Sequence, residues 1–304
     1  MLKYIDLHTG LEFTEGRACV LCLGNFDGVH IGHSALIEKT IERRDELGIL
    51  GGAWCFGQPP ADFLLSAPTP KLTTLDEKLE LFAKKGLDLA VLGDFSALRN
   101  TAPEDFVNDV LKERCHCKSA VCGFNFRFGK GGTGLPNMLS GFEHGSEIVY
   151  PVTLNGQIVS SSNIRQLLLS GDAEAAAKML GAPYFITGEI THGRALGKNL
   201  GMPTINLEIP SGKLIPRHGV YASTVELDGK EYRAVSNVGS NPTVGGNAVR
   251  CETHILDFDR DVYGARVKVS LCSHLRDEMH FSSTDELVQT VQNDILTARK
   301  YFAI

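Results

Sequence analysis

The chain has 304 residues, enough for two domains with separate hydrophobic cores. Its 43% hydrophobic and 22% charged residues are typical of a soluble folded protein and exclude a disordered, collagen-like or coiled-coil chain. A formal net charge of -6 leaves no overall positive field for nucleic acid or an anionic membrane surface, so any anionic ligand must be bound by a local site.

The first part of the chain alternates short apolar runs with helical periodicity, which predicts a parallel sheet with crossover helices. The expected strands are 18–23, 49–56, 87–92, 118–122 and 147–150. The expected helices are 32–47, 75–85, 103–112, 162–169 and 172–180. We therefore expect a doubly wound α/β domain over residues 1–182.

The pattern changes at Gly181-Ala182-Pro183, where we place the domain boundary. Beyond it, apolar stretches separated by turn residues predict an antiparallel barrel without intervening helices. These strands are expected at 184–191, 204–208, 220–227, 231–238, 251–256 and 265–271. Segment 283–301 begins with Ser and Thr cap candidates and predicts a C-terminal helix. Its apolar face would carry Leu287, Val288, Val291, Ile295 and Leu296.

The cysteines and the N-terminus indicate a cytoplasmic protein. The first ten residues lack the basic and apolar regions of a signal peptide, and no run approaches about 18 apolar residues. Most of the eight cysteines lie in apolar runs, so disulfides are not expected. Cys19 and Cys22, and the group at 115–117 and 122, have spacings that zinc sites use. Strand alternation would point Cys19 and Cys22 to opposite faces, which argues against zinc.

The segment Gly24 to His33, GNFDGVHIGH, follows the first predicted strand directly and opens the first predicted helix. In a doubly wound sheet, ligands bind beyond the carboxyl ends of the strands, where a helix start offers unpaired N–H groups to an anion. The glycines let the backbone approach a phosphate closely. His30 and His33 are three residues apart and share one face of the helix, where they could hydrogen-bond phosphate oxygens. The alternative is that the two histidines merely cap the helix.

Two further segments are expected at the same site. The segment 122–130, CGFNFRFGK, leaves the fourth predicted strand with aromatic rings, an amide and cations, which suit a phosphorylated heterocycle. The segment 160–165, SSSNIR, starts a helix with hydroxyl caps and places Arg165 on its first turn. Each could instead be ordinary loop or capping chemistry. The chain contains no G-x-x-x-x-G-K-[ST] segment, which argues against a P-loop enzyme.

The second half of the chain has glycine-punctuated loops followed by polar residues on predicted strands. Thr204 and Asn206 alternate on one strand, so their hydroxyl and amide oxygens face the same way and suit Mg²⁺. Glu252, on a later strand, could remove a proton from a substrate hydroxyl. The alternative is that all three residues are structural. We expect this second phosphate-handling pocket to lie inside the barrel.

The order of these segments resembles the bifunctional bacterial riboflavin kinase/FAD synthetase family. The resemblance runs from GNFDGVHIGH through SSSNIR to the kinase segment GMPTIN at 201–206, then through GVY at 219–221, CETH at 251–254 and residues 276–281. It implies a Rossmann-like nucleotidyltransferase domain that adenylylates FMN and a six-stranded flavokinase barrel that phosphorylates riboflavin with Mg-ATP. The implied small molecules are riboflavin, FMN, FAD and ATP, with no nucleic acid or membrane partner; the resemblance implies no oligomeric state.

The resemblance also implies a role for particular residues. His30 and His33 would contact the ATP phosphates, and Glu252 would be the base toward the riboflavin 5'-hydroxyl. The nucleotide and FMN would be held in the first domain by Gly24, Phe26, Asn125, Arg127, Ser161, Ser162 and Arg165. Thr204 and Asn206 would ligate Mg-ATP, and Arg276 would lie near the flavin phosphate end. Gly193 and Lys198 would bind nucleotide or flavin.

Some positions depart from the family pattern and leave two alternatives open. Ser162 stands for the usual Thr, Lys198 stands for Arg, and segment 56–60 has Gln58 but lacks the usual histidine. One alternative is therefore a riboflavin kinase with a degenerate nucleotidyltransferase domain. The other is a flavin-binding protein without catalysis.

Overall fold

The computed structural model describes residues 2–6, 16–58, 63, 69–191, 202–240 and 249–304. The chain divides into two compact units, Met1–Ser160 and Ser161–Ile304. None of the helices in these described ranges is long and apolar enough to cross a lipid bilayer.

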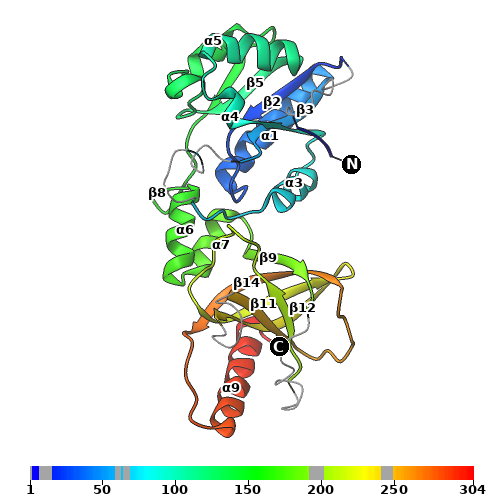
Figure 1. Ribbon diagram of the computed structural model, residues 1–304, viewed down its shortest axis with the longest axis vertical. Helices are drawn as coiled ribbons and strands as arrows, with labels where there is room; N and C mark the ends of the chain where they lie inside the picture. Colours follow the sequence, from blue (N-terminus) through cyan, green and yellow to red (C-terminus); the bar gives the residue numbers. More distant parts are fainter. Residues whose placement is uncertain (1, 7–15, 59–62, 64–68, 192–201, 241–248) are drawn as a thin grey trace. The chain divides into compact units, whose positions relative to one another are not determined.

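The first unit is built on a six-stranded parallel sheet (Figure 1). In spatial order its strands are β1 (Lys3–Asp6), β4 (Leu89–Gly93), β3 (Leu50–Phe56), β2 (Cys19–Leu23), β5 (Cys117–Gly123) and β6 (Ser146–Val149). Strands β2 to β6 confirm the predicted ones. The edge strand β1 is four residues long, too short to show an alternation in the sequence.

Helices cover both faces of this sheet, as the doubly wound pattern predicts. On one face, Val20 and Cys22 of β2 pack with α1 (Ile31–Leu47) and α3 (Leu75–Lys84). On the other face, Cys19, Leu21 and Leu23 pack against the helical segment η2 (Phe106–Arg114). Cys19 and Cys22 therefore face opposite sides, as predicted, and all eight cysteines are buried free thiols.

The remaining elements of the first unit are short. The predicted helix 103–112 begins as α5 (Pro103–Asp105) but continues as a π-helix in η2, a difference that local propensity does not signal. The others are α4 (Phe95–Leu98), the 3₁₀ turns η3 (Lys130–Gly132) and η4 (Pro136–Gly141), and the hairpin of β7 (Thr153–Leu154) and β8 (Gln157–Ile158).

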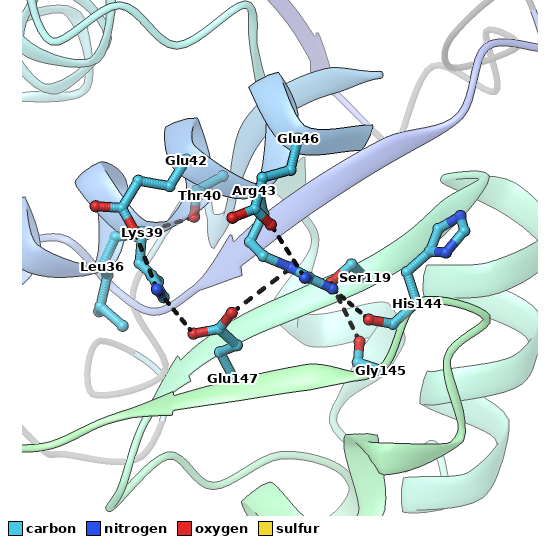
Figure 2. Close-up of polar contacts among 10 residues, drawn as sticks. All are labelled: Leu36, Lys39, Thr40, Glu42, Arg43, Glu46, Ser119, His144, Gly145 and Glu147. Carbon is cyan, nitrogen blue, oxygen red and sulfur yellow. Dashed lines mark hydrogen bonds and ion pairs between the residues drawn. The ribbon is translucent and has the colours of Figure 1, made fainter. Parts of the chain in front are cut away.

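Arg43 ties α1 to the β5–β6 edge of the sheet (Figure 2). Its guanidinium donates to the carbonyl of His144 and to the Ser119 hydroxyl, and it lies 3.6 Å from the Glu147 carboxylate on β6. Lys39, one turn earlier, reaches the same carboxylate at 3.3 Å. Because Arg43 is largely buried, these contacts fix the helix against the strands more firmly than exposed ion pairs would.

The second unit begins with two helices and continues as an antiparallel barrel (Figure 1). The helices α6 (Ser161–Ser170) and α7 (Ala173–Leu180) confirm the two predicted ones. In spatial order the barrel strands are β10 (Ile205–Glu208), β13 (Val249–Ile255), β12 (Lys230–Ser240), β11 (Gly219–Leu227), β14 (Arg266–Arg276) and β9 (Tyr184–Glu189). A bridge between Thr191 and Asn206 nearly closes the barrel.

The barrel interior and the C-terminal helix occupy opposite faces of the strands. Inside, Ser223, Ser236 and Thr253 are fully buried and form a chain of hydroxyl hydrogen bonds at 2.7 and 2.8 Å. Outside, α9 (Thr284–Phe302) starts at its Ser283 cap, as predicted, and packs Ala298 against β11 and β12. The predicted face of α9 is partly wrong: Leu296 is 64% exposed, and Asp294 and Ala298 are the buried positions.

Candidate functional site

The loop after β2 lies where the strand order of the first sheet reverses. From β2, the chain adds β3 and β4 on one side and β5 and β6 on the other. The carboxyl ends of β2 and β5 therefore flank the switch point, where open α/β sheets bind their ligands. The predicted segments 24–33 and 122–130 span the loops that leave these two strands. Their common position supports one nucleotide site at this edge.

His30 and His33 form a stacked pair at the start of α1. His30 is the N-cap residue, and its Nδ1 accepts a hydrogen bond from the backbone N–H of His33 at 3.2 Å. The two imidazole rings lie 3.7 Å apart and nearly parallel. With Nδ1 acting as acceptor, a neutral His30 carries its proton on Nε2, which makes that atom a donor. The capping role and a donor role are thus compatible in one side chain.

Both imidazoles are held in the neutral form. Burial lowers the pKa of His30 from 6.5 to about 4. Burial also holds the pKa of His33 well below its usual range, with smaller contributions from His30 and Lys78. Among the described residues, the Nδ1 atom of His33 is buried and has no hydrogen-bond partner. The pair can therefore offer N–H donors near neutral pH without a proton being added.

Two other predicted residues of the loop serve the histidines. The Phe26 side chain is fully buried and packs 5.1 Å from the His33 ring, so any ligand contact by Phe26 must come from its backbone. A Cβ at Gly24 would lie 3.3 Å from the Phe26 ring, and one at Gly32 would lie 3.2 Å from the His30 ring. Side chains at these glycines would therefore press on the rings that form the site.

The loop after β5 presents polar groups above a packed aromatic base. Asn125 and Arg127 are exposed, and Arg127 donates to the carbonyl of Phe126 at 3.3 Å. Phe128 belongs to the core below the sheet, and Phe126 stacks on it at 5.7 Å. Of the three phenylalanines in this segment, only Phe124 is mostly free of the core, at 44% exposed.

The segment 160–165 starts α6, as predicted, and belongs to the second unit. Ser161 is the first residue of the helix, Ser162 is exposed, and Arg165 is half-buried on the first turn. A ligand role for these three residues stays a prediction.

Three of the residues predicted for the kinase site lie in one row of strand partners across the barrel. Asn206 on β10 is the register partner of Glu252 on β13, which is in turn the partner of Asn237 on β12. The row continues through Val220 on β11 to Arg276 at the end of β14. Register partners in a sheet share a face, so five strands contribute to one surface.

This surface is on the outside of the barrel, so the expectation of a pocket inside it is wrong. Glu252 alternates with Cys251 and Thr253, which are fully buried in the barrel interior. Val220 packs with Ala298 of the external helix α9. The interior is instead filled by the hydroxyl chain and apolar side chains, which leave the outer face for the site.

Asn206 has an atom that needs a partner. The residue is 4% exposed, and its side-chain oxygen has no hydrogen-bond partner among the described residues. An unsatisfied buried oxygen costs free energy, and an oxygen donor of this kind fits a divalent cation. Thr204 is half-buried and immediately precedes β10, two residues before Asn206.

Arg276 is held by the C-terminal helix. Its Nε and Nη2 atoms donate to the buried Asp294 carboxylate at 2.9 and 2.8 Å, and Nη1 donates to the carbonyl of Asp277 at 3.0 Å. The guanidinium is therefore fixed at the β14 end of the row. The predicted residues Gly193 and Lys198 lie outside the described residues.

A metal cluster of cysteines is not found in the described ranges. In them, no group of three or more His, Cys, Asp or Glu residues could hold a metal ion. Burial raises the pKa of the Cys22 thiol to about 12 and that of Cys122 to about 11, so these thiols stay protonated near neutral pH.

Comparisons with known proteins match both halves of the chain. A FAD synthetase family model matches residues 12–163, and a riboflavin kinase family model matches residues 180–302. The bifunctional riboflavin kinase/FMN adenylyltransferase of Escherichia coli K12 is 36% identical over 313 positions, which cover 100% of this chain and 99% of that protein. The chain belongs to this bifunctional family.

A second relative and a solved structure match over nearly the same length. The riboflavin kinase/FMN adenylyltransferase of Bacillus subtilis is 32% identical and covers 95% of this chain and 94% of its own. A solved structure from Streptococcus pneumoniae, described as a macrolide-efflux protein, is 29% identical with a TM-score of 0.86; the match covers 98% of this chain and 99% of the other.

Some residues of the two sites escape sequence reasoning. Asn237 completes the row beside Glu252, yet only strand pairing shows it. The Asp27 carboxylate accepts from the backbone N–H groups of Leu72 and Thr73 at 2.9 and 3.2 Å. Its place inside the GNFDGVHIGH segment is a signal that it matters, but its distant partners are not readable from the sequence.

Proposed function

We propose that this family member phosphorylates riboflavin to FMN with Mg-ATP and then adenylylates FMN to FAD, releasing pyrophosphate. The observation that carries the proposal is that both family models match one chain, each over a part with its own candidate phosphate site. We assign adenylyl transfer to residues 1–182 and riboflavin phosphorylation to residues 183–304.

For adenylyl transfer, a phosphate oxygen of FMN attacks the α-phosphorus of ATP, and the bond to pyrophosphate breaks. The Nε2–H of His30 and the N–H of His33 donate to ATP phosphate oxygens as negative charge moves onto the leaving group. The free N–H groups at the start of α1 bind the same oxygens. We assign nucleotide and FMN contacts in the first unit to Gly24, the backbone of Phe26, Asn125 and Arg127. As the family resemblance implies, we also assign ligand contacts to Ser161, Ser162 and Arg165.

For riboflavin phosphorylation, the 5'-hydroxyl oxygen attacks the γ-phosphorus of ATP, and ADP leaves. Glu252 accepts the hydroxyl proton, and strand pairing places Asn206 beside it. Thr204 and Asn206 would hold Mg²⁺, which when bound neutralises charge on the ATP phosphates. We assign Arg276, anchored by Asp294, to the flavin phosphate end. Gly193 and Lys198 remain expected nucleotide-binding residues and lie outside the described residues.

We propose that the enzyme works in the cytoplasm on free riboflavin, FMN and ATP, with no nucleic acid or membrane partner. The net charge of -6 supports this, because it disfavours binding to polyanions.

Incubating the purified full chain with riboflavin, ATP and Mg²⁺ tests the proposal by chromatography of the flavins. Both FMN and FAD are expected, and the absence of both refutes the proposal. In a second assay FMN is supplied instead of riboflavin. If the protein makes FMN from riboflavin but no FAD from the supplied FMN, it is a riboflavin kinase with a degenerate first domain. Two variants separate the sites. Glu252→Gln should lower riboflavin phosphorylation by roughly 10²- to 10⁴-fold and leave FMN adenylylation intact. His30→Ala should do the converse, by about 10²-fold or more.

A further inference from the structure

Lys78 is a buried lysine beneath the loop that joins β2 to α1. It lies on the first turns of α3 and is 6% exposed. Its Nζ atom donates to the backbone carbonyl of Asn25 at 2.8 Å. Burying an ammonium group costs free energy unless it is hydrogen-bonded or paired with an opposite charge. The hydrogen bond to Asn25 therefore offsets part of the cost of burying Lys78.

The loop that Lys78 contacts has an unusual backbone. Phe26 has φ 52°, Gly28 has φ 82° and Val29 has φ 42°. A left-handed conformation at a β-branched residue such as Val29 is strained, and it persists only where the surroundings hold it. The conformation is useful because it turns the chain sharply between the strand end and the His30 cap.

The segment before and within α3 supplies the contacts that hold this backbone. The Asp27 carboxylate accepts from Leu72 and Thr73, and the Thr73 hydroxyl accepts from the N–H of Gly28 at 3.1 Å. The Phe26 ring packs edge-on against Phe82 at 5.3 Å. Lys78 adds the one contact of this set made by a charged donor to the loop carbonyl, at Asn25.

The start of α3 is itself rigid, so it can serve as a support. Thr74 and Glu77 form a reciprocal capping box, with hydrogen bonds of 3.2 and 2.8 Å. Glu77 is fully buried and immediately precedes Lys78. The ammonium is therefore presented from a fixed helix end, and its charge also reaches His33, whose pKa it helps to lower.

We propose that Lys78 is a positioning residue for adenylyl transfer: its ammonium holds the Asn25 carbonyl so that the Gly24–His30 loop keeps its ATP-binding shape. It acts through the loop and does not touch ATP. This inference rests on the proposed adenylyltransferase function. It gives α3, which lies outside the GNFDGVHIGH segment, an indirect part in ATP binding.

The test compares Lys78→Met and Lys78→Arg in the full chain, with Lys84→Met as the control from an exposed position on the same helix. FAD formation from FMN gives the KM for ATP and the KM for FMN. Lys78→Met is expected to raise the KM for ATP at least about tenfold and to leave the KM for FMN within about twofold, because one charge-assisted hydrogen bond to the ATP loop is lost. Lys78→Arg should restore most of the ATP affinity, and Lys84→Met should match the wild type.

Folding is checked in the same samples. Trp54 is the chain's single tryptophan and lies buried on β3, so its emission reports on the first unit alone. If Lys78→Met loses the emission of a buried tryptophan, Lys78→Gln replaces it, since a neutral amide keeps a weaker donor for Asn25. That variant should raise the KM for ATP at least about threefold.

The outcomes separate the two hypotheses. If the wild type forms no FAD from FMN, the proposed function fails. If the wild type forms FAD and a folded Lys78→Met or Lys78→Gln protein keeps the wild-type KM for ATP, the role of Lys78 is refuted. Equal loss of affinity for ATP and FMN, without rescue by Lys78→Arg, would show a merely structural residue and would also overturn the proposal.

Discussion

His30 should make the stability of the first unit depend on pH. Its pKa is lowered from 6.5 to about 4 because burial disfavours the imidazolium. Between these values the unfolded chain binds a proton that the folded chain does not. The stabilisation is thus fully present above about pH 6.5 and is lost as the pH falls toward 4. Linkage gives a loss of about 2 kcal/mol between pH 7.5 and pH 5 from His30 alone.

His30→Asn isolates this effect. Asparagine is an equally good N-cap, so the variant keeps an acceptor for the His33 N–H while removing the titrating group. Urea unfolding followed by Trp54 fluorescence reports on the first unit at each pH. The unfolding free energy of His30→Asn should fall less than that of the wild type, by about 2 kcal/mol over the same range.

The control is His144→Asn in the same unit, whose side chain is 38% exposed. Its profile shows how much an exposed histidine of the same unit contributes over this pH range. If the His30→Asn profile were parallel to that of the wild type, His30 would not be buried in its neutral form. The description of the stacked pair as two neutral donors would then be wrong.

Three further predictions follow from the packing. Arg43→Met should destabilise the first unit by about 1.5–3 kcal/mol in unfolding monitored by Trp54, because the His144 carbonyl and Ser119 lose a charged donor. The control Lys39→Met should cost less than about 1 kcal/mol. Equal costs would contradict the anchoring role of Arg43. Asn206→Leu should change the unfolding free energy of the second unit by less than about 1 kcal/mol, since it removes an oxygen without a partner among the described residues. It should raise the Mg²⁺ concentration needed for riboflavin phosphorylation at least about tenfold. An unchanged Mg²⁺ requirement would exclude Asn206 as a ligand. Gly219→Ala should speed thermal inactivation of riboflavin phosphorylation, because a Cβ there would lie 2.3 Å from the Arg276 carbonyl oxygen. Gly229→Ala, with open space around its Cβ, should cost only about 1–2 kcal/mol of backbone strain. Similar losses in both variants would argue against the close approach at Gly219.

The sequence predicts much of the fold for reasons that are local. Alternation and apolar runs mark β2 to β6 and the barrel strands, and the Ser283 cap marks the start of α9. Local patterns do not signal the π-helical hydrogen bonds of η2, because the apolar spacing in Phe106–Arg114 suits an ordinary α-helix equally well. Leu296 shows the same limit: its helical position was readable, but the width of the face that α9 buries was not.

The sites divide in the same way. The glycines, His30, His33, Asn206 and Glu252 are candidates from the sequence alone, because residue types and spacings of this kind suit phosphate and metal binding. The family models match both parts of the chain that hold them. What lies on each side of them is decided by contacts between distant segments. Lys78 meets Asn25 across 53 residues, and Asn206, Asn237 and Glu252 become neighbours only through strand register.

The sequence by itself therefore determined the kind of chemistry and the order of the elements that carry it, because both are written in short stretches of residues. Only the tertiary structure decided that the Phe26 side chain is buried and that the row with Asn206 and Glu252 lies on the outer face of the barrel. It also decided that the histidine pair is neutral. The physical reason is that burial and register depend on segments far apart in the chain, whose free energies of packing no local pattern contains.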